Sequence, residues 1–384
     1  RAHRASAHFH PQVNAKAGYT LLQERPSFDV DDFGTFHFGA GDNWTTSIGV
    51  EYPLYTGGKL EGMRDASRAG LRGAEHDHER QRQLAALTAA RAYFRALEAR
   101  RMIGVLEEQI EALQEALRTG QAMYDQGVAA KIDVLRPQAA LGGARNGLSQ
   151  VRAGYQTALA ALAETMGLPP GTLVDIVERE ADRATPELAP EQWEAAWEAR
   201  PELQALQAKR KAAAAQVRVA RSDKRPQVGL FVLSEVVRPT YFPETGHFSG
   251  GVMVQQSVSD GGATRAAVRE ARHRLSQLDA ADEQLRNGIA VQVQAAINET
   301  GSARARVDTT EESLAVAREA LRLAQIGYQN GVTPMLDLLS AQAAMTRANA
   351  DHEGALSALR QAFAEYDAAM GRIVGRAQGD ARGG

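Results

Sequence analysis

Two aspartates occupy matching places in two similar segments of the chain. Asp133 lies in "YDQGVAAKIDVL" (124–135) and Asp337 lies in "YQNGVTPMLDLL" (328–339), each six residues after the glycine of a Tyr-x-x-Gly motif. If several copies of the chain surround an axis, carboxylates of this kind repel one another and can bind a cation. The alternative interpretation is an ordinary solvated aspartate in the helix that follows the glycine. In both cases the expected chemistry is electrostatic, and no bond is made or broken.

Other residues that could carry chemistry form no recognisable site. His3, His8 and His10 are scattered near the start, and His76 and His78 are two residues apart, so they do not share a helix face. The sequence contains no H-E-x-x-H, P-loop or G-x-S-x-G motif. The absence of cysteine excludes disulfides, thiolate metal sites and a cysteine nucleophile. We therefore expect no enzyme, no cofactor and no metal site.

Composition narrows the class of protein further. The chain has 384 residues, of which 44% are hydrophobic and 24% charged, as in a folded protein. A net charge of −3 gives no general basic field for nucleic acid, so no nucleic-acid partner is expected. No stretch approaches the roughly 18 apolar residues of a membrane-spanning helix. The first residues, "RAHRASAHFHPQV", contain no apolar signal region, as expected of a processed or trimmed chain.

The chain contains an internal duplication. The two Tyr-x-x-Gly motifs are 204 residues apart (124 and 328), and the Gly-Gly pairs at 57–58 and 261–262 have the same spacing. The Pro-Gln-Val sequences at Pro11 and Pro226 are 215 residues apart, so the loop between these landmarks is 11 residues longer in the first half. A repeat at such an interval indicates two homologous halves.

Each half opens with two alternating segments that are typical of β-strands. In the segment that ends at Tyr55, one face carries apolar and aromatic residues, and the other carries Ser47, Gly49 and Glu51. The second half repeats the alternation with Phe248 and Val252 on the apolar face. Each segment has about ten residues, the length of a tilted strand that crosses a membrane.

Long helical segments follow each Gly-Gly pair and end at each Tyr-x-x-Gly, where Gly127 and Gly331 suit a left-handed C-cap. At 1.5 Å per residue, about 60 residues of helix would extend about 90 Å. The predicted elements fall into four parts: a first repeat at 1–166, with strands at about 11–24 and 44–55 and helices at 59–126 and 131–166; a linker at 167–190; a second repeat at 191–370, with a helix at 191–221, strands at about 226–237 and 248–258 and helices at 263–330 and 334–370; and a tail at 371–384. The first half lacks a counterpart of the helix at 191–221: either the protein has no such element or, as we expect, an N-terminal helix has been removed from this chain.

The strand exits "YPLYTGGK" and "VSDGGA", together with the two Tyr-x-x-Gly breaks, occur in an order that resembles the TolC-like outer-membrane factor (outer-membrane efflux protein) family. The resemblance covers essentially the whole chain. It implies an α+β membrane protein that is a homotrimer: each protomer would give four strands to one transmembrane β-barrel and long helices to an α-helical coiled-coil barrel. The implied place is the outer membrane of a Gram-negative bacterium, extending into the periplasm.

The same resemblance implies a function and partners. The protein would be the passive trans-periplasmic duct of a tripartite efflux or type I secretion system. It would contact outer-membrane lipid, a periplasmic adaptor protein and, through the adaptor, an inner-membrane pump. Small molecules, ions or polypeptides are all possible cargo, and neither the cargo nor the pump class follows from the sequence.

Three sets of residues take roles by this resemblance. The adaptor-docking tip comprises Gly127, Val128, Ala129, Gly331, Val332 and Thr333. The periplasmic entrance comprises Asp133, Asp337, Ser340, Tyr124 and Tyr328. The lipid-facing barrel residues are Trp44, Ile48, Val50, Tyr52, Phe248 and Val252. The best-known family pattern has a second acid where this chain has Ser340 and an arginine where it has Thr333, so a double-carboxylate gate with an arginine latch is not expected.

Two other interpretations fit part of the pattern. A soluble, elongated coiled-coil periplasmic adaptor or scaffold would also have long helices, but it would not need lipid-length strands or two copies of the long helices. An enzyme is a more distant alternative. At the residue level, the Tyr-x-x-Gly motifs could serve only as helix caps, and Trp44, Tyr52 and Tyr55 could belong to a globular core.

Overall fold

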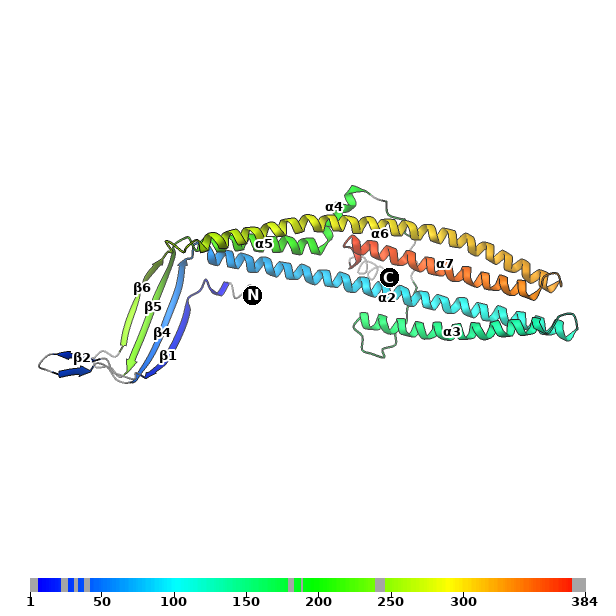
Figure 1. The fold of residues 1–384 in the computed structure, drawn as a ribbon, viewed down its shortest axis with the longest axis horizontal. Helices are drawn as coiled ribbons and strands as arrows, with labels where there is room; N and C mark the ends of the chain where they lie inside the picture. Colours follow the sequence, from blue (N-terminus) through cyan, green and yellow to red (C-terminus); the bar gives the residue numbers. More distant parts are fainter. Residues whose placement is uncertain are drawn as a thin grey trace. The chain divides into compact units, whose positions relative to one another are not determined.

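The structure is a computed structural model, and it describes residues 6–21, 27–30, 34–37, 42–178, 183–187, 189–238 and 246–374. Helix predominates, and in each half the strands of the sheet directly precede the two long helices (Figure 1). The first half contains β1 (Gln12–Leu21), β2 (Ser27–Val30), β3 (Gly34–His37), β4 (Asp42–Tyr55), α2 (Lys59–Asp125) and α3 (Ile132–Thr165). The second half contains α4 (Pro190–Ala199), α5 (Pro201–Ser222), β5 (Gln227–Arg238), β6 (Gly246–Gln255), α6 (Ala263–Gln329) and α7 (Met335–Ala369).

The chain forms two compact units, and each unit combines parts of both repeats. Unit 1 comprises residues 1–77 and 202–284, and unit 2 comprises residues 78–201 and 285–384. Both α2 and α6 begin in unit 1 and end in unit 2, because each helix has 67 residues. The compact units therefore do not coincide with the sequence repeats.

Unit 1 contains a four-stranded antiparallel sheet in the order β1-β4-β5-β6 (Figure 1). The register places Val13 opposite Val50, Val50 opposite Val232, and Leu230 opposite Val252, so these apolar side chains share one face. On the described part of the chain, no strand pairs with the outer edge of β1 or of β6. The sheet thus has two open edges.

The strand boundaries differ from the predicted ones by a few residues. The strand predicted at 11–24 ends at Leu21, and residues 22–24 lie outside the described residues. The strand predicted at 248–258 ends at Gln255, because Asp260 instead caps α6: its carboxylate accepts hydrogen bonds from the backbone N–H of Gly262 (3.0 Å) and Thr264 (2.7 Å). The sequence analysis missed the hairpin of β2 and β3, which lies in the longer first-half loop.

The single helix predicted at 191–221 is wrong. The structure has two helices there, and they meet at Arg200, whose backbone is extended (φ −75°, ψ 117°). Pro201 explains the break, because proline has no N–H and disfavours a helical conformation of the residue before it. The predicted helix included this proline, although proline rarely lies in the interior of a helix.

The four helices of the two hairpins end in the same way. Gly127, Gly167, Gly331 and Gly371 all have positive φ angles between 70° and 77°. After α2, the N–H of Gly127 bonds to the carbonyl of Tyr124 (2.9 Å) and the N–H of Val128 to that of Met123 (3.0 Å). The same two bonds recur after α3, α6 and α7. This is the Schellman C-cap, and glycine adopts its left-handed conformation without steric cost.

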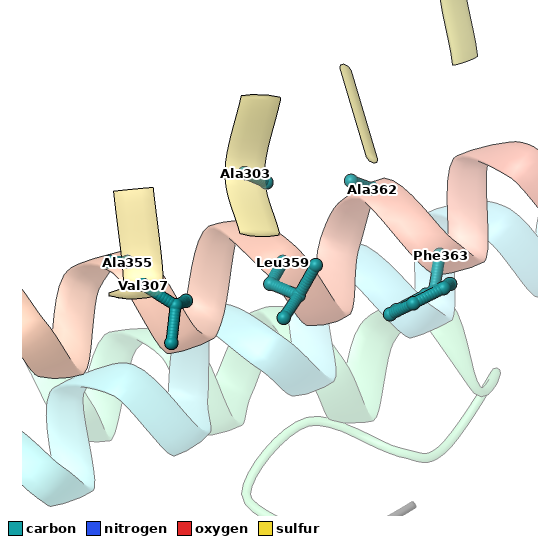
Figure 2. Packing of buried hydrophobic residues seen from close by; sticks show 6 residues of the cluster. All are labelled: Ala303, Val307, Ala355, Leu359, Ala362 and Phe363. Carbon is teal, nitrogen blue, oxygen red and sulfur yellow. The ribbon is translucent and has the colours of Figure 1, made fainter. Parts of the chain in front are cut away.

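In unit 2 each long helix packs against the helix that follows it. Leu113 of α2 contacts Leu141 of α3, and Leu97 contacts Leu162, so the two helices run antiparallel. Ala303 and Val307 of α6 pack against α7 (Figure 2) in a cluster completed by Ala355, Leu359, Ala362 and Phe363. Small residues alternate with large ones in these seams, which lets neighbouring helices approach closely.

The segment between the repeats is irregular and is bound to the helices of unit 2. Ile176 is 3% exposed and packs on Leu97 and Leu162. The guanidinium of Arg183 donates two hydrogen bonds of 2.9 Å to the carboxylate of Asp367. Residues 179–182 and 188 of the predicted linker, and 375–384 of the predicted tail, lie outside the described residues.

Candidate functional site

The two interhelical turns each present an exposed valine. Val128 is 72% exposed in the α2–α3 turn, and Val332 is 80% exposed in the α6–α7 turn. Each follows the left-handed glycine of a Schellman cap, which fixes the backbone direction of the turn. The structure therefore gives both predicted tip segments the same backbone and the same exposed apolar residue.

The two turns differ in how they pack beneath these valines. A Cβ atom at Gly327 would lie 2.1 Å from the hydroxyl oxygen of Thr333, so only glycine leaves room for that side chain. In the first half the equivalent positions hold Met123 and Ala129. The larger side chain thus stands at the first position in the first half and at the second position in the second half.

The two tyrosines of the Tyr-x-x-Gly motifs have different environments. Tyr124 is 40% exposed, whereas Tyr328 is 6% exposed and packs with Met335 and Leu338. A Cβ at Gly120 would lie 3.6 Å from the hydroxyl oxygen of Tyr328, 3.0 Å from the Met335 methyl and 2.9 Å from the Asp133 carbonyl oxygen. Gly120 therefore lets four helices converge around Tyr328.

The buried tyrosine lies in the field of one of the two aspartates. Burial, and after it the negative charge of Asp133, raises the pKa of Tyr328 above its ordinary value. The hydroxyl group of Tyr328 is buried and has no hydrogen-bond partner in the structure. Asp133 itself accepts a hydrogen bond from the N–H of Ala130 (3.3 Å). The structure thus brings Asp133 and Tyr328 into electrostatic contact.

Asp337 and Ser340 stand apart from this cluster. Both are exposed, and the Ser340 hydroxyl donates a hydrogen bond to the carbonyl of Leu336 in its own helix (2.8 Å). A neighbouring cleft is lined by acidic residues of α2, among them Glu108, Glu111 and Glu115, and by Tyr328. Arg118 also lines this cleft and contacts Glu115 (2.5 Å from Nη2 to Oε2), so Glu108 and Glu111 give the cleft an excess of negative charge. Within the described residues no group of His, Cys, Asp and Glu is arranged to hold a metal ion.

The predicted lipid-facing residues share one face of the sheet. Five of them are exposed: Trp44 (59%), Ile48 (54%), Tyr52 (37%), Phe248 (79%) and Val252 (60%); Val50 is half-buried. The register also adds Val13, Tyr19 and Leu21 of β1 to this face. The opposite face carries Ser47, Glu51 and their partners Lys16 and Gln12. One face is therefore apolar and exposed, and the other is mainly polar.

Sequence reasoning missed the residues that shape the turns. Gly120, Gly327 and Met335 do not stand out as motifs, because a glycine or methionine inside a helical pattern has many explanations. One signal was available: when the repeats are aligned, Gly327 falls on Met123 and Met335 on Lys131. Such large differences between equivalent positions indicate sites where the two turns pack differently.

A family model described as "Outer membrane efflux protein" matches residues 1–168 and 193–372. The chain belongs to this family. Members of the outer membrane efflux protein family are outer-membrane proteins of efflux and secretion, which confirms the expected function class and location. Family and fold are those of channel proteins, and the expected absence of enzymatic activity is consistent with them.

Individual relatives agree with the family. The chain is 27% identical to protein CyaE of Bordetella pertussis over 381 residues, which is 96% of this chain and 77% of CyaE. It is 25% identical to the alkaline protease secretion protein AprF of Pseudomonas aeruginosa over 341 residues, 86% of this chain and 69% of AprF. It is 24% identical to the outer membrane efflux protein BepC of Brucella suis over 257 residues, 66% of this chain and 56% of BepC.

Solved structures of outer-membrane channels have the same fold. CusC superposes with a TM-score of 0.81 at 17% identity (96% of this chain, 85% of CusC), and OprN with 0.80 at 21% (96% and 83%). VceC of Vibrio cholerae gives 0.79 at 17% (96% and 89%). The family match together with this shared fold does not support the alternative of a soluble adaptor. No helix among the described residues is both long and apolar enough to cross a membrane.

Proposed function

We propose that this protein is a homotrimeric duct that carries export cargo through the outer membrane for a tripartite efflux or type I secretion system. Three copies would close one barrel of twelve strands, and their long helices would form a tunnel in the periplasm. The protein would be passive, with energy supplied by an inner-membrane pump through a periplasmic adaptor. The name of the alkaline protease secretion protein AprF, which matches over 86% of this chain, favours the secretion branch without deciding the cargo.

The observation that carries the proposal is the four-stranded sheet with one exposed apolar face and two open edges. A strand edge inside lipid leaves backbone N–H and C=O groups unpaired, and each unpaired group costs several kcal/mol. Pairing β1 of one copy with β6 of the next would satisfy both edges. Four strands cannot close a barrel, so the sheet needs further copies of itself.

The turns support a docking role at the other end of the helices. Val128 and Val332 are apolar and exposed, and rigid glycine caps present them. An adaptor helix could pack on such residues at little entropic cost, because the turns are already ordered. The six predicted tip residues form this surface, with Ala129 and Thr333 half-buried beneath it.

The aspartates support an acidic entrance. In a trimer Asp133 and Asp337 would each occur three times around the axis, and Glu108 and Glu111 would add further negative charge. Like charges held near one another favour bound cations and slow the passage of anions. Tyr328 beside Asp133 would join this entrance, whereas the exposed Tyr124 belongs to the surface of the turn.

The proposal is tested on the detergent-extracted full chain. Light scattering should give the mass of three copies, and planar lipid bilayers should show steady ionic conductance after the protein is added. Conductance should be cation-selective, and Asp133→Asn with Asp337→Asn should reduce that selectivity by about two- to fivefold without changing the mass. A monomer that stays soluble without detergent and gives no conductance would refute the duct.

A further inference from the structure

The helices of unit 1 distribute their charges unequally between two faces. Helix α5 lies between α2 and α6: a Cβ at Gly73 of α2 would lie 3.6 Å from Ala208, and Arg210 contacts Asp279 of α6 (2.7 Å from Nε to Oδ1). The remaining surface of α5 consists of two exposed faces. Helical periodicity places Lys211, Arg218 and Arg221 on one of them and Lys209 on the other.

Two ion pairs show which face of α2 lies on the same side as each of the two exposed faces of α5. Arg218 contacts Asp65 (2.7 Å from Nη2 to Oδ2), and Asp65 shares its face of α2 with Arg68 and Arg72, three and seven residues later. On the opposite side, Lys209 contacts Asp77 (3.4 Å from Nζ to Oδ2). Arg68 and Arg72 therefore lie on the same side of these helices as Arg218.

Helix α6 extends the same side. Asp279, the partner of Arg210, shares a helix face with Arg272, Arg269 and Arg265, which precede it by seven, ten and fourteen residues. Because α6 runs antiparallel to α5, the face of α6 that carries Arg272, Arg269 and Arg265 lies on the same side of the three helices as Arg218. We call the resulting surface the basic face; it comprises Arg68, Arg72, Lys211, Arg218, Arg221, Arg265, Arg269 and Arg272.

The basic face is largely unneutralised, in contrast to the opposite one. All eight cations are exposed, and among the described residues no carboxylate pairs with Arg221, Arg265 or Arg269. On the opposite face three cations have a carboxylate partner among the described residues: Lys59 contacts Asp223, Lys209 contacts Asp77, and Arg274 contacts Glu270. A chain with a net charge of −3 thus concentrates positive charge on one side of unit 1.

The basic face continues the apolar face of the sheet. Lys59, on the opposite helix face, lines a cavity whose strand residues belong mainly to the polar face of the sheet, among them Gln12, Glu51 and Gln255; Tyr52, Val228 and Leu230 of the apolar face also border it. The polar face of the sheet therefore lies on the same side of unit 1 as the helix face opposite the basic face. The apolar sheet face must then continue into the basic face. Tyr52 and Tyr55 (45% exposed) lie at the end of β4 from which the helices of unit 1 begin.

We propose that the basic face binds the anionic headgroups of phospholipids in the periplasmic leaflet of the outer membrane. The inference rests on the proposed function, which places the apolar sheet face in lipid. An apolar band that ends in tyrosines and is followed by arginines matches the order of layers at a membrane surface. At 1.5 Å per residue, Arg265 and Arg269 lie within about 10 Å of the start of α6, so their long side chains reach the headgroup layer.

The test compares two triple variants of the full-length protein. Arg221→Gln, Arg265→Gln and Arg269→Gln remove three cations of the basic face, whereas Lys59→Gln, Lys209→Gln and Arg274→Gln remove the same charge from the opposite face. Each protein is titrated in detergent with mixed micelles of phosphatidylglycerol or of phosphatidylcholine, and bound lipid is counted by native mass spectrometry at several salt concentrations. Inorganic phosphate is added as a competitor in a parallel series.

The wild type should bind phosphatidylglycerol more tightly than phosphatidylcholine, and the preference should weaken as salt rises. Each arginine near a membrane surface contributes about a fivefold effect, so the basic-face variant should lose up to about a hundredfold of the preference. The opposite-face variant should keep it. Equal losses in both variants, or no preference in the wild type, would overturn the proposal; full displacement by millimolar phosphate would replace the lipid with a simple phosphate site.

Failure of this inference can be told apart from failure of the proposed function. Mass and conductance are measured on the same preparations. A trimer that conducts but shows no preference for anionic lipid overturns only the lipid site. A protein that neither assembles nor conducts removes the premise on which the site depends.

Discussion

At the scale of single residues, the packing of α2, α3, α6 and α7 around Tyr328 depends on glycines that leave room for neighbouring side chains. Gly120 leaves space for the Tyr328 hydroxyl, and Gly327 leaves space for Thr333. Adding a methyl group at either position would force its neighbours to move, which costs about 1–3 kcal/mol in a packed site. The packing at the tip of the second half therefore depends on the space that the glycines leave as much as on the side chains that fill it.

The ionisation of Tyr328 provides a direct test of this cluster. Because burial and the Asp133 charge raise its pKa, the folded protein keeps this proton at a pH where an unfolded chain loses it. The associated stability is fully present below the ordinary tyrosine pKa of about 10 and is lost as pH rises through the folded value. In an alkaline titration of tyrosinate absorbance, Tyr328→Phe should remove a late-titrating step.

The same substitution should not weaken the protein at neutral pH. The buried hydroxyl has no partner, so Tyr328→Phe should leave the free energy of unfolding unchanged or raise it by up to about 1 kcal/mol. Asp133→Asn should move the late step to lower pH, and Tyr124→Phe, at the exposed counterpart, should leave the late step in place. If Tyr328→Phe leaves the titration unaltered, the tyrosine is not buried as described.

At the scale of elements, each of the two turns joins two long helices through a Schellman cap and exposes one valine to solvent. The cap bonds use backbone groups and a left-handed glycine, so the valine side chain is not needed for folding. This separation of roles allows docking to be tested without disturbing the turn.

Val128→Asp together with Val332→Asp should abolish binding to the cognate adaptor, because a charge would replace apolar contact area at both turns. The change should reduce adaptor binding by at least about tenfold, measured by cross-linking or by co-purification from membranes. Val316→Asp, at a 71% exposed position within α6, introduces the same charge away from the turns and should have no effect. Unchanged adaptor binding by the double variant, at normal protein levels, would remove the docking role.

At the scale of the whole molecule, the sheet cannot be satisfied by one copy of the chain. Its apolar face needs lipid and its two edges need strands, and the described residues of one chain supply neither. In the proposed trimer, assembly and membrane insertion would therefore be coupled. A change on one face of β4 should affect insertion, while the same change on the other face should not.

Ile48→Lys places a charge near the middle of the apolar face, where a lysine facing the bilayer midplane costs about 2–4 kcal/mol. We expect little protein in the outer-membrane fraction and little trimer by semi-native electrophoresis. Ser47→Lys, one residue away on the polar face, should insert and assemble normally. Equal insertion of the two variants would contradict the assignment of the faces.

The sequence determined most of the fold because its patterns are local and occur twice. Period-2 alternation, long helical runs and the glycine at each break predicted the four sheet strands and the four long helices within a few residues. The helix break at Arg200 was not predicted, although Pro201, which causes it, is visible in the sequence. The β2–β3 hairpin was not predicted because its segment has no counterpart in the second half. The sequence also predicted the family, through motifs that recur in order.

Tertiary structure alone decided what differs between the repeats. Tyr124 and Tyr328 belong to identical motifs, yet one is exposed and the other buried, because the surrounding helices bring Gly120 and Met335 together only at the second. The basic face likewise arises from three helices that are distant in sequence, aligned by pairs such as Arg218 and Asp65. Burial and shared faces depend on contacts between distant segments, and periodicity within one segment carries no information about which segments meet.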